Sequence, residues 1–96
     1  MTPIALAAKA GYLEVVKSLA VRNAKLEAKD KIHGRTAIAV AAKAGQLDVV
    51  KDLAARNANL EAKGKDGLTA ISVAAQACQW EVVKELTIHK VNLETK

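Results

Sequence analysis

The residues that could carry acid–base or metal chemistry are few in this chain, and they stand apart from one another. The two histidines, His33 and His89, lie far apart, and neither has an acidic partner at the spacing of a catalytic motif. Cys78 is the only cysteine, so no internal disulfide can form and no cysteine pair is present for zinc. Cys78 and His89 together match no metal-site pattern. We therefore interpret His33 as a loop-tip residue, His89 as a helix-end residue and Cys78 as a small, partly buried apolar residue.

Hydroxyl and glycine motifs give no better support for catalysis. The segment "GKDG" at 64–67 lacks the glycine spacing of a phosphate-binding loop, and no Gly-Lys-Ser or Gly-Lys-Thr opens a helix after it. Thr36, Thr69 and Ser72 have no base in a motif that would activate them as nucleophiles, so they are better suited to helix starts. The sequence predicts a protein that is not an enzyme and that uses no cofactor and no metal.

Composition narrows the class of protein further. The chain of 96 residues has no phenylalanine, and Tyr12 and Trp80 are its only aromatic residues. Burial must therefore come from Ala, Val, Leu and Ile, which suit helices packed closely in one small domain over residues 1–96. The apolar run "PIALAA" is followed by Lys9 and is too short for a signal peptide or a membrane span. With the single cysteine, these features predict a soluble intracellular protein, cytoplasmic rather than nuclear.

One passage occurs three times along the chain. It reads "TPIALAA" from Thr2, "TAIAVAA" from Thr36 and "TAISVAA" from Thr69, at spacings of 34 and then 33 residues. The register continues downstream through the valine pairs at 15–16, 49–50 and 82–83 and through the leucines Leu26, Leu60 and Leu93. A period of this length is typical of stacked supersecondary units. The expected repeats cover about residues 2–34, 35–67 and 68–96.

Each repeat reads as a pair of short helices. The first helix begins at a threonine suited to N-capping, with Pro3 at the first helical position of repeat one. Gly11 and Gly45 can adopt the left-handed conformation that ends a helix. The expected first helices are 3–10, 37–44 and 70–77, and the expected second helices are 13–22, 47–56 and 80–89.

The second helices carry an apolar stripe and a charged face. In each first turn an acid precedes a lysine by three residues, in the pairs Glu14 and Lys17, Asp48 and Lys51, and Glu81 and Lys84. Trp80 stands where the other repeats have leucine, so we expect it to pack against the edge of the last unit. Asn23 and Asn57 tolerate positive φ and should close their helices, before a turn or projecting hairpin.

These residues resemble the ankyrin repeat family over essentially the whole chain. The resemblance rests on Asp30, Gly34 and Thr36, on the alanine pairs at 7–8, 41–42 and 74–75, on Gly11 and Gly45, and on the closes "NAKLEAK" and "NANLEAK". Departures are Ala5, Ala39 and Ser72 where the family prefers histidine, Ala37 and Ala70 in place of proline, and Cys78 in place of glycine. The resemblance implies an all-α solenoid of three stacked helix-turn-helix units with hairpin-like connecting loops.

The resemblance also implies a function and a surface. Ankyrin repeats are expected to act as non-catalytic protein-interaction modules or scaffold segments, through the concave side and the loop tips. Carried over to this sequence, the expected contact residues are Lys9, Ala10, Lys31, Ile32, His33, Arg35, Lys43, Ala44, Lys65, Asp66, Leu68, Gln76 and Ala77. Lysine recurs in this set and the formal net charge is +5, so an acidic partner protein is favoured.

One other function and one property of the ends stay open at this point. The basic charge would also suit nucleic acid or another polyanion, although aromatic residues for stacking are scarce and nucleic-acid-binding signatures are absent from the sequence. Repeat arrays normally end in units with a polar outer face, whereas Ile4 and Leu6 lie close to the chain start and Lys90 replaces the closing asparagine. We expect a segment of a longer array or an engineered, minimised one, with marginal stability and weak self-association through its end repeats.

Overall fold

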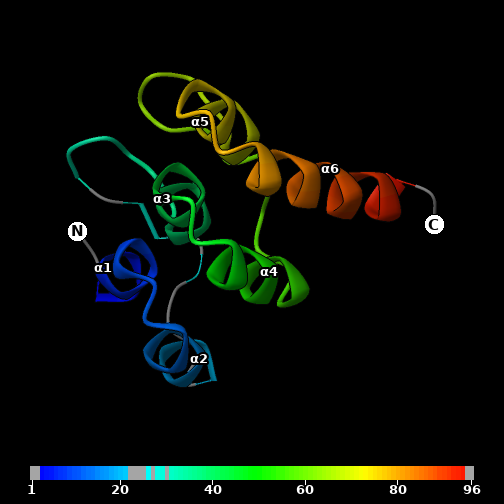
Figure 1. The fold of residues 1–96 in the computed structure, drawn as a ribbon. Coiled ribbons are helices and arrows are strands. Elements are labelled where there is room, and N and C mark those ends of the chain that lie inside the picture. Colours follow the sequence, from blue (N-terminus) through cyan, green and yellow to red (C-terminus); the bar gives the residue numbers. More distant parts are fainter. Residues whose placement is uncertain (1–2, 22–25, 27, 30, 95–96) are drawn as a thin grey trace.

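Three helix pairs stack side by side in the computed structural model, which describes residues 3–21, 26, 28–29 and 31–94. The helices of these residues are α1 (Pro3–Ala10), α2 (Leu13–Val21), α3 (Ala37–Ala44), α4 (Leu47–Ala55), α5 (Ala70–Gln76) and α6 (Trp80–Glu94), and no strand occurs among them. We call α1, α3 and α5 the first helices and α2, α4 and α6 the second helices of units one, two and three. Figure 1 shows the first helices in one row, the second helices in another, and the connecting loops beside the first row.

The first helices begin where the repeated passage predicts, and α1 and α3 also end there. Thr69 is the N-cap of α5 and its side chain accepts a hydrogen bond from the Ser72 backbone N–H, whereas Thr36 occupies the N-cap of α3 without such a bond. Gly11 and Gly45 follow α1 and α3 with φ of 77° and 73°, so their left-handed role is confirmed. The predicted bounds of α1 and α3 are confirmed, and α5 is one residue shorter than predicted. Thr2 lies outside the described residues.

The core is continuous across the units because small side chains let the helices approach closely. All six residues from Ala37 to Ala42 are buried, although α3 is only eight residues long. Helix α3 packs on α1 and on α5, and α4 packs on α2 and on α6. Val16, Val50 and Leu86, one from each unit, belong to the same buried cluster.

The last helix is longer than predicted, and the reason lies at one position. Asn57 takes a φ of 65° just after α4, as expected, whereas its counterpart Lys90 lies inside α6. Lysine favours helix and lacks asparagine's tolerance for positive φ, so the helix continues. The Lys90 Nζ also lies 3.4 Å from the Glu61 Oε2, which ties α6 to unit two. Our prediction that this helix ends near residue 89 is therefore wrong, while Asn23 lies outside the described residues.

Three side chains of unit three differ from the predictions. Cys78 is exposed at a φ of 60°, so its predicted partial burial is wrong. The Trp80 side chain is 59% exposed rather than packed at the edge, whereas Leu13 and Leu47 at the same position pack against the core. His89 is not at a helix end: it lies within α6, with its Nε2 2.8 Å from the Glu85 Oε2.

Candidate interaction surface

The connecting loop of units two and three closes as a tight hairpin, which we call the second hairpin (residues 63–68). The Gly64 N–H donates to the Leu68 carbonyl oxygen at 3.1 Å, and the Gly67 N–H donates to the Gly64 carbonyl oxygen at 3.0 Å. The Asp66 Oδ1 accepts a hydrogen bond from the Leu68 N–H at 3.0 Å, an Asx turn that suits aspartate. These bonds hold the second hairpin in a defined shape without a β-strand.

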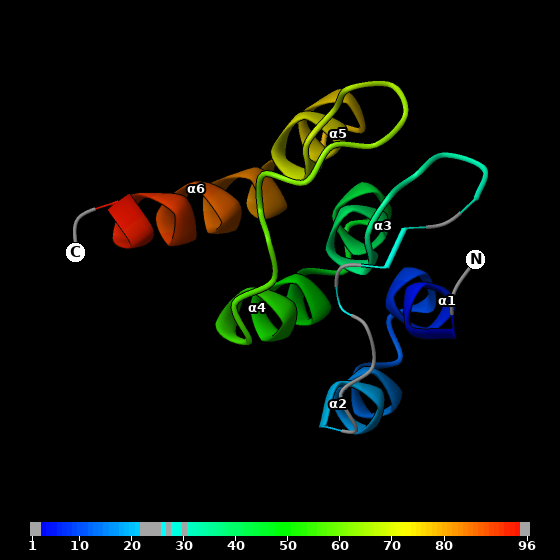
Figure 2. The same ribbon diagram turned by 180° about the vertical axis from the view of Figure 1, so that it is seen from behind.

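The first hairpin (residues 29–35, with residue 30 outside the described residues) packs directly on the second. The Lys65 N–H donates to the His33 carbonyl oxygen at 2.8 Å, and the Lys65 Nζ donates to the Lys31 carbonyl oxygen. In the other direction, the Lys29 Nζ donates to the Lys63 carbonyl oxygen at 2.8 Å. Figure 2 shows the two loops next to each other beyond the first helices, so the tips form one surface.

Two further features fix the contact between the hairpins. A Cβ at Gly64 would lie 2.9 Å from the His33 carbonyl oxygen, so only glycine fits this close approach. The Arg35 Nη2 lies 3.2 Å from the Asp66 Oδ2, and the Arg35 side chain is largely buried. The Leu68 N–H, followed by the Arg35 guanidinium, holds the pKa of Asp66 below its usual value.

The first helices continue this surface with a column of exposed residues. Lys9, Ala10, Lys43, Ala44 and Gln76 are exposed at equivalent positions of α1, α3 and α5, whereas Ala77 is half-buried. At the hairpins, Lys31, Ile32, His33, Lys65 and Asp66 are exposed, and Arg35 and Leu68 are half-buried. The structure therefore brings the predicted contact residues together around the loop tips and the first helices.

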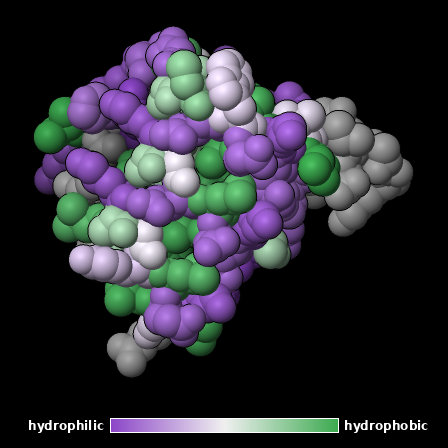
Figure 3. All heavy atoms as spheres, viewed as in Figure 1, coloured by the Kyte–Doolittle hydropathy of each residue, from purple (hydrophilic) through white to green (hydrophobic). Residues whose placement is uncertain are grey.

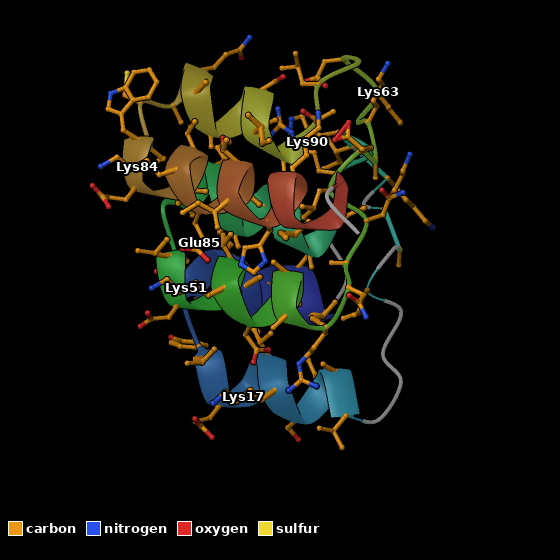
Figure 4. All side chains as sticks on the ribbon, turned by 90° about the vertical axis from the view of Figure 1, so that its right-hand side faces the viewer. Lys17, Lys51, Lys63, Lys84, Glu85 and Lys90 are labelled. Carbon is orange, nitrogen blue, oxygen red and sulfur yellow. The ribbon has the colours of Figure 1, made fainter. Side chains whose placement is uncertain are left out.

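The charges of the two helix rows are arranged differently. On the second helices, Lys17 and Lys84 lie 3.8 Å and 3.9 Å from Glu14 and Glu81. Within the part of the chain that the structure describes, no ion pair includes Lys9 or Lys43 of the first helices. Figure 4 shows Lys17, Lys51 and Lys84 in one column on the second helices, with Lys63 near the opposite edge. In Figure 3, hydrophilic side chains cover much of the visible face and hydrophobic ones lie between them in separate groups.

One repeated contact between units was missed by the sequence reasoning, and we call it the glutamine clasp. The Gln46 Nε2 donates to the Lys9 carbonyl oxygen at 3.1 Å, and the Gln79 Nε2 donates to the Lys43 carbonyl oxygen at 3.3 Å. The amide lies so close to the preceding unit that a Cβ at Gly45 would be 2.5 Å from the Gln79 Oε1. Glutamine at the same position of two units, each facing a glycine, was the signal in the sequence.

The described residues contain no group of three or more His, Cys, Asp or Glu side chains placed to hold a metal ion. None of the helices in the described ranges is both long enough and apolar enough to cross a membrane.

Comparisons with known proteins agree on one fold. A family model described as "Ankyrin repeats (3 copies)" matches residues 1–96. A chain from the solved complex of the Bd0816 predatory endopeptidase from Bdellovibrio bacteriovorus with immunity protein Bd3460 is 36% identical, with a TM-score of 0.86. The match covers 93% of this chain and 46% of that chain, so this chain spans about half its length. No curated protein matches, and because 297 solved chains do, the fold alone does not identify a partner.

Proposed function

Because this chain belongs to the ankyrin repeat family, we propose that it binds an acidic partner protein through the hairpin tips and the exposed side of the first helices. Ankyrin repeats are protein-interaction modules, and the similar solved chain comes from a complex of two proteins. The role proposed for this chain is non-catalytic and is carried out in the cytoplasm. We also propose that copies of this chain associate weakly with one another through their end units.

The observation that supports this surface is the separation of the two sets of lysines. Lys17 and Lys84 already face carboxylates on their own helices, so a partner gains little by approaching them. Lys9 and Lys43 are exposed at equivalent positions, and among the described residues neither forms an ion pair. An acidic surface that spans two units would meet both at once, and the attraction adds to the association rate.

The hairpins contribute a fixed shape as well as positive charge. The ammonium groups of Lys29 and Lys65 donate to backbone carbonyl oxygens of the neighbouring hairpin. Ile32 is exposed at the tip of the first hairpin and offers an apolar contact beside these charges. The proposed partner surface is therefore acidic opposite the first helices and carries an apolar group opposite residue 32.

A charge-reversal comparison tests the proposal. After a partner is identified by pull-down, Lys9→Glu with Lys43→Glu should weaken its binding by about tenfold or more at low salt, and less at high salt. Lys17→Glu with Lys84→Glu changes the net charge by the same amount on the second helices and should leave affinity nearly unchanged, because both lysines already lie beside carboxylates. Lys65 is left intact because its ammonium group holds the two hairpins together.

A nucleic-acid binding assay and the two double variants together distinguish a protein partner from a polyanion. Fluorescence polarisation with random-sequence DNA and RNA at two salt concentrations should show only weak binding. Equal losses from the two double variants, with unchanged circular dichroism, would mean that net charge drives binding and that this surface is not the site. Strong, salt-sensitive affinity for the nucleic acids would replace the protein partner by a polyanion.

A further inference from the structure

The outer side of unit one exposes apolar residues whose counterparts are buried. Leu6 is 56% exposed, whereas Val40 at the same position of unit two is 6% exposed. Val15 is 48% exposed, whereas Val49 is 1% exposed. Leu19 is half-buried, although its counterparts in units two and three are fully buried. We call Leu6, Val15 and Leu19 the leading face, because in units two and three the same positions pack against the preceding unit.

On the outer side of unit three, a second set of apolar residues is less buried than its counterparts. Ile71, Ala75 and Val83 are half-buried, whereas their counterparts Ile38, Ala42 and Val50 are among the most buried residues of the core. We call Ile71, Ala75 and Val83 the trailing face, because in units one and two the same positions pack against the following unit. The interior junctions between α1 and α3 and between α3 and α5 are each a trailing face packed on a leading face.

The two outer faces are therefore the two halves of a junction that the chain already forms twice. Leucine and valine on one side and isoleucine, alanine and valine on the other are the residue types of the interior junctions. A second copy of this chain carries the half that each outer face lacks. Contacts of this head-to-tail kind do not close on themselves and can continue from copy to copy.

The glutamine clasp is the part of the junction that the outer faces lack. Tyr12 stands at the position of Gln46 and Gln79, so the leading face offers a phenol ring in place of the amide. Cys78 stands at the position of Gly11 and Gly45, and its Cβ occupies the space that the clasp amide fills in the interior junctions. A junction between two copies therefore lacks both the donor amide of the clasp and the space that a glycine leaves for it.

We propose that copies of this chain stack head to tail, the leading face of one on the trailing face of the next, and that Tyr12 and Cys78 keep this stacking weak. The inference rests on the self-association in the proposed function and gives it a geometry. Burial of the two apolar faces drives the contact. The missing clasp hydrogen bond and the crowding between the Tyr12 ring and the Cys78 side chain oppose it.

Complementary variants test the geometry by sedimentation velocity over a concentration series. Leu6→Glu blocks the leading face and Ala75→Glu blocks the trailing face, so each variant alone should associate at least about tenfold more weakly than wild type, because each would bury a charge. Mixed in equal amounts, the two should form a 1:1 dimer, since the intact trailing face of the first fits the intact leading face of the second. Val15→Glu and Val83→Glu serve as a second pair, and circular dichroism confirms folding.

Restoring the glutamine clasp between two copies tests the role of Tyr12 and Cys78. Tyr12→Gln with Cys78→Gly should tighten self-association by about tenfold, the effect of one hydrogen bond and relieved crowding. Ile88→Glu changes an exposed apolar residue whose counterpart in unit two, Ala55, is also exposed, so it should leave association unchanged.

The outcomes separate this inference from the partner-binding proposal. Association of Ala75→Glu alone at the wild-type strength, or a mixture that stays monomeric while wild type associates, would overturn the head-to-tail geometry. A wild type and a clasp-restored variant that both remain monomeric would overturn stacking altogether. Leu6→Glu should still bind the acidic partner, because Lys9 and Lys43 are unchanged.

Discussion

At the residue scale, the glycines after the first helices do two things at once. Gly45 adopts a left-handed conformation and also leaves room for the Gln79 amide of the next unit. Gly67 at the tip of the second hairpin has a similar φ of 78°, but a Cβ there would meet no atom within 4 Å. The two positions therefore differ in packing and not in backbone conformation.

This difference predicts unequal losses of stability. Gly67→Ala should lower the free energy of unfolding by about 1–2 kcal/mol, the cost of a left-handed alanine. Gly45→Ala should cost about 1 kcal/mol more, because its Cβ displaces the Gln79 amide and breaks the clasp. Urea denaturation followed by circular dichroism measures both values. In a Gln79→Ala background the two losses should become equal, and a difference that persists there would contradict the packing explanation.

At the element scale, the two hairpins act as one loop cluster that a single carboxylate helps to hold. The Leu68 N–H and the Arg35 guanidinium hold the pKa of Asp66 below its usual value, so the folded form favours the charged carboxylate. Linkage then makes this stabilisation complete above the usual pKa of aspartate, about pH 4, and removes it as the pH falls through the lower folded pKa.

The expected result is a stability difference between wild type and Asp66→Asn that depends on pH. It should be constant between about pH 5 and pH 7 and shrink below about pH 4, as the wild-type carboxylate becomes protonated. Thermal unfolding of both proteins from pH 2 to pH 7 measures it, and the subtraction removes the titration of other carboxylates. A difference that grows toward low pH would show that the Asp66 pKa is raised by folding instead.

The sequence predicted the elements better than their surroundings. Gly11, Gly45 and Asn57 fix helix ends through their own backbone preference, which can be read residue by residue. The continuation of α6 past Lys90 also involves Glu61 of another unit. The exposure of Trp80 depends on packing between units, which the local sequence pattern does not contain.

Some features of the candidate surface could likewise be predicted from the sequence, and others could not. Its exposed helix column follows from the period alone, because equivalent positions of stacked units share a side. The contacts between the hairpins could not be foreseen, since Lys65 and Lys31 are donor and acceptor across two loops of different length. The repeated glutamine at 46 and 79 was visible in the sequence, but its partner is a carbonyl oxygen, which no side-chain pattern reveals.

At the scale of the whole molecule, stability should depend on how many neighbours a unit has. Leu53 is fully buried in unit two, whereas its counterpart Leu19 is half-buried at the leading face. Leu53→Ala should therefore cost about 2–5 kcal/mol, and Leu19→Ala clearly less, because its site is already partly open to water. Denaturant unfolding of both variants measures the two losses, and equal values would mean that unit one is buried as completely as unit two.

The order of the units along the chain also has a consequence during synthesis. Helix α1 packs on α3, and α3 packs on α5, so units one and two bury their trailing sides against residues that are translated later. The helix pair of unit one leaves the ribosome before α3 and α4, so Ile4, Ala8 and Val16 should stay partly open to water, as their counterparts on the trailing face of unit three are, until those helices have emerged. A translational pause between α2 and α3 would therefore hold a nascent helix pair with its stacking side open to chaperones.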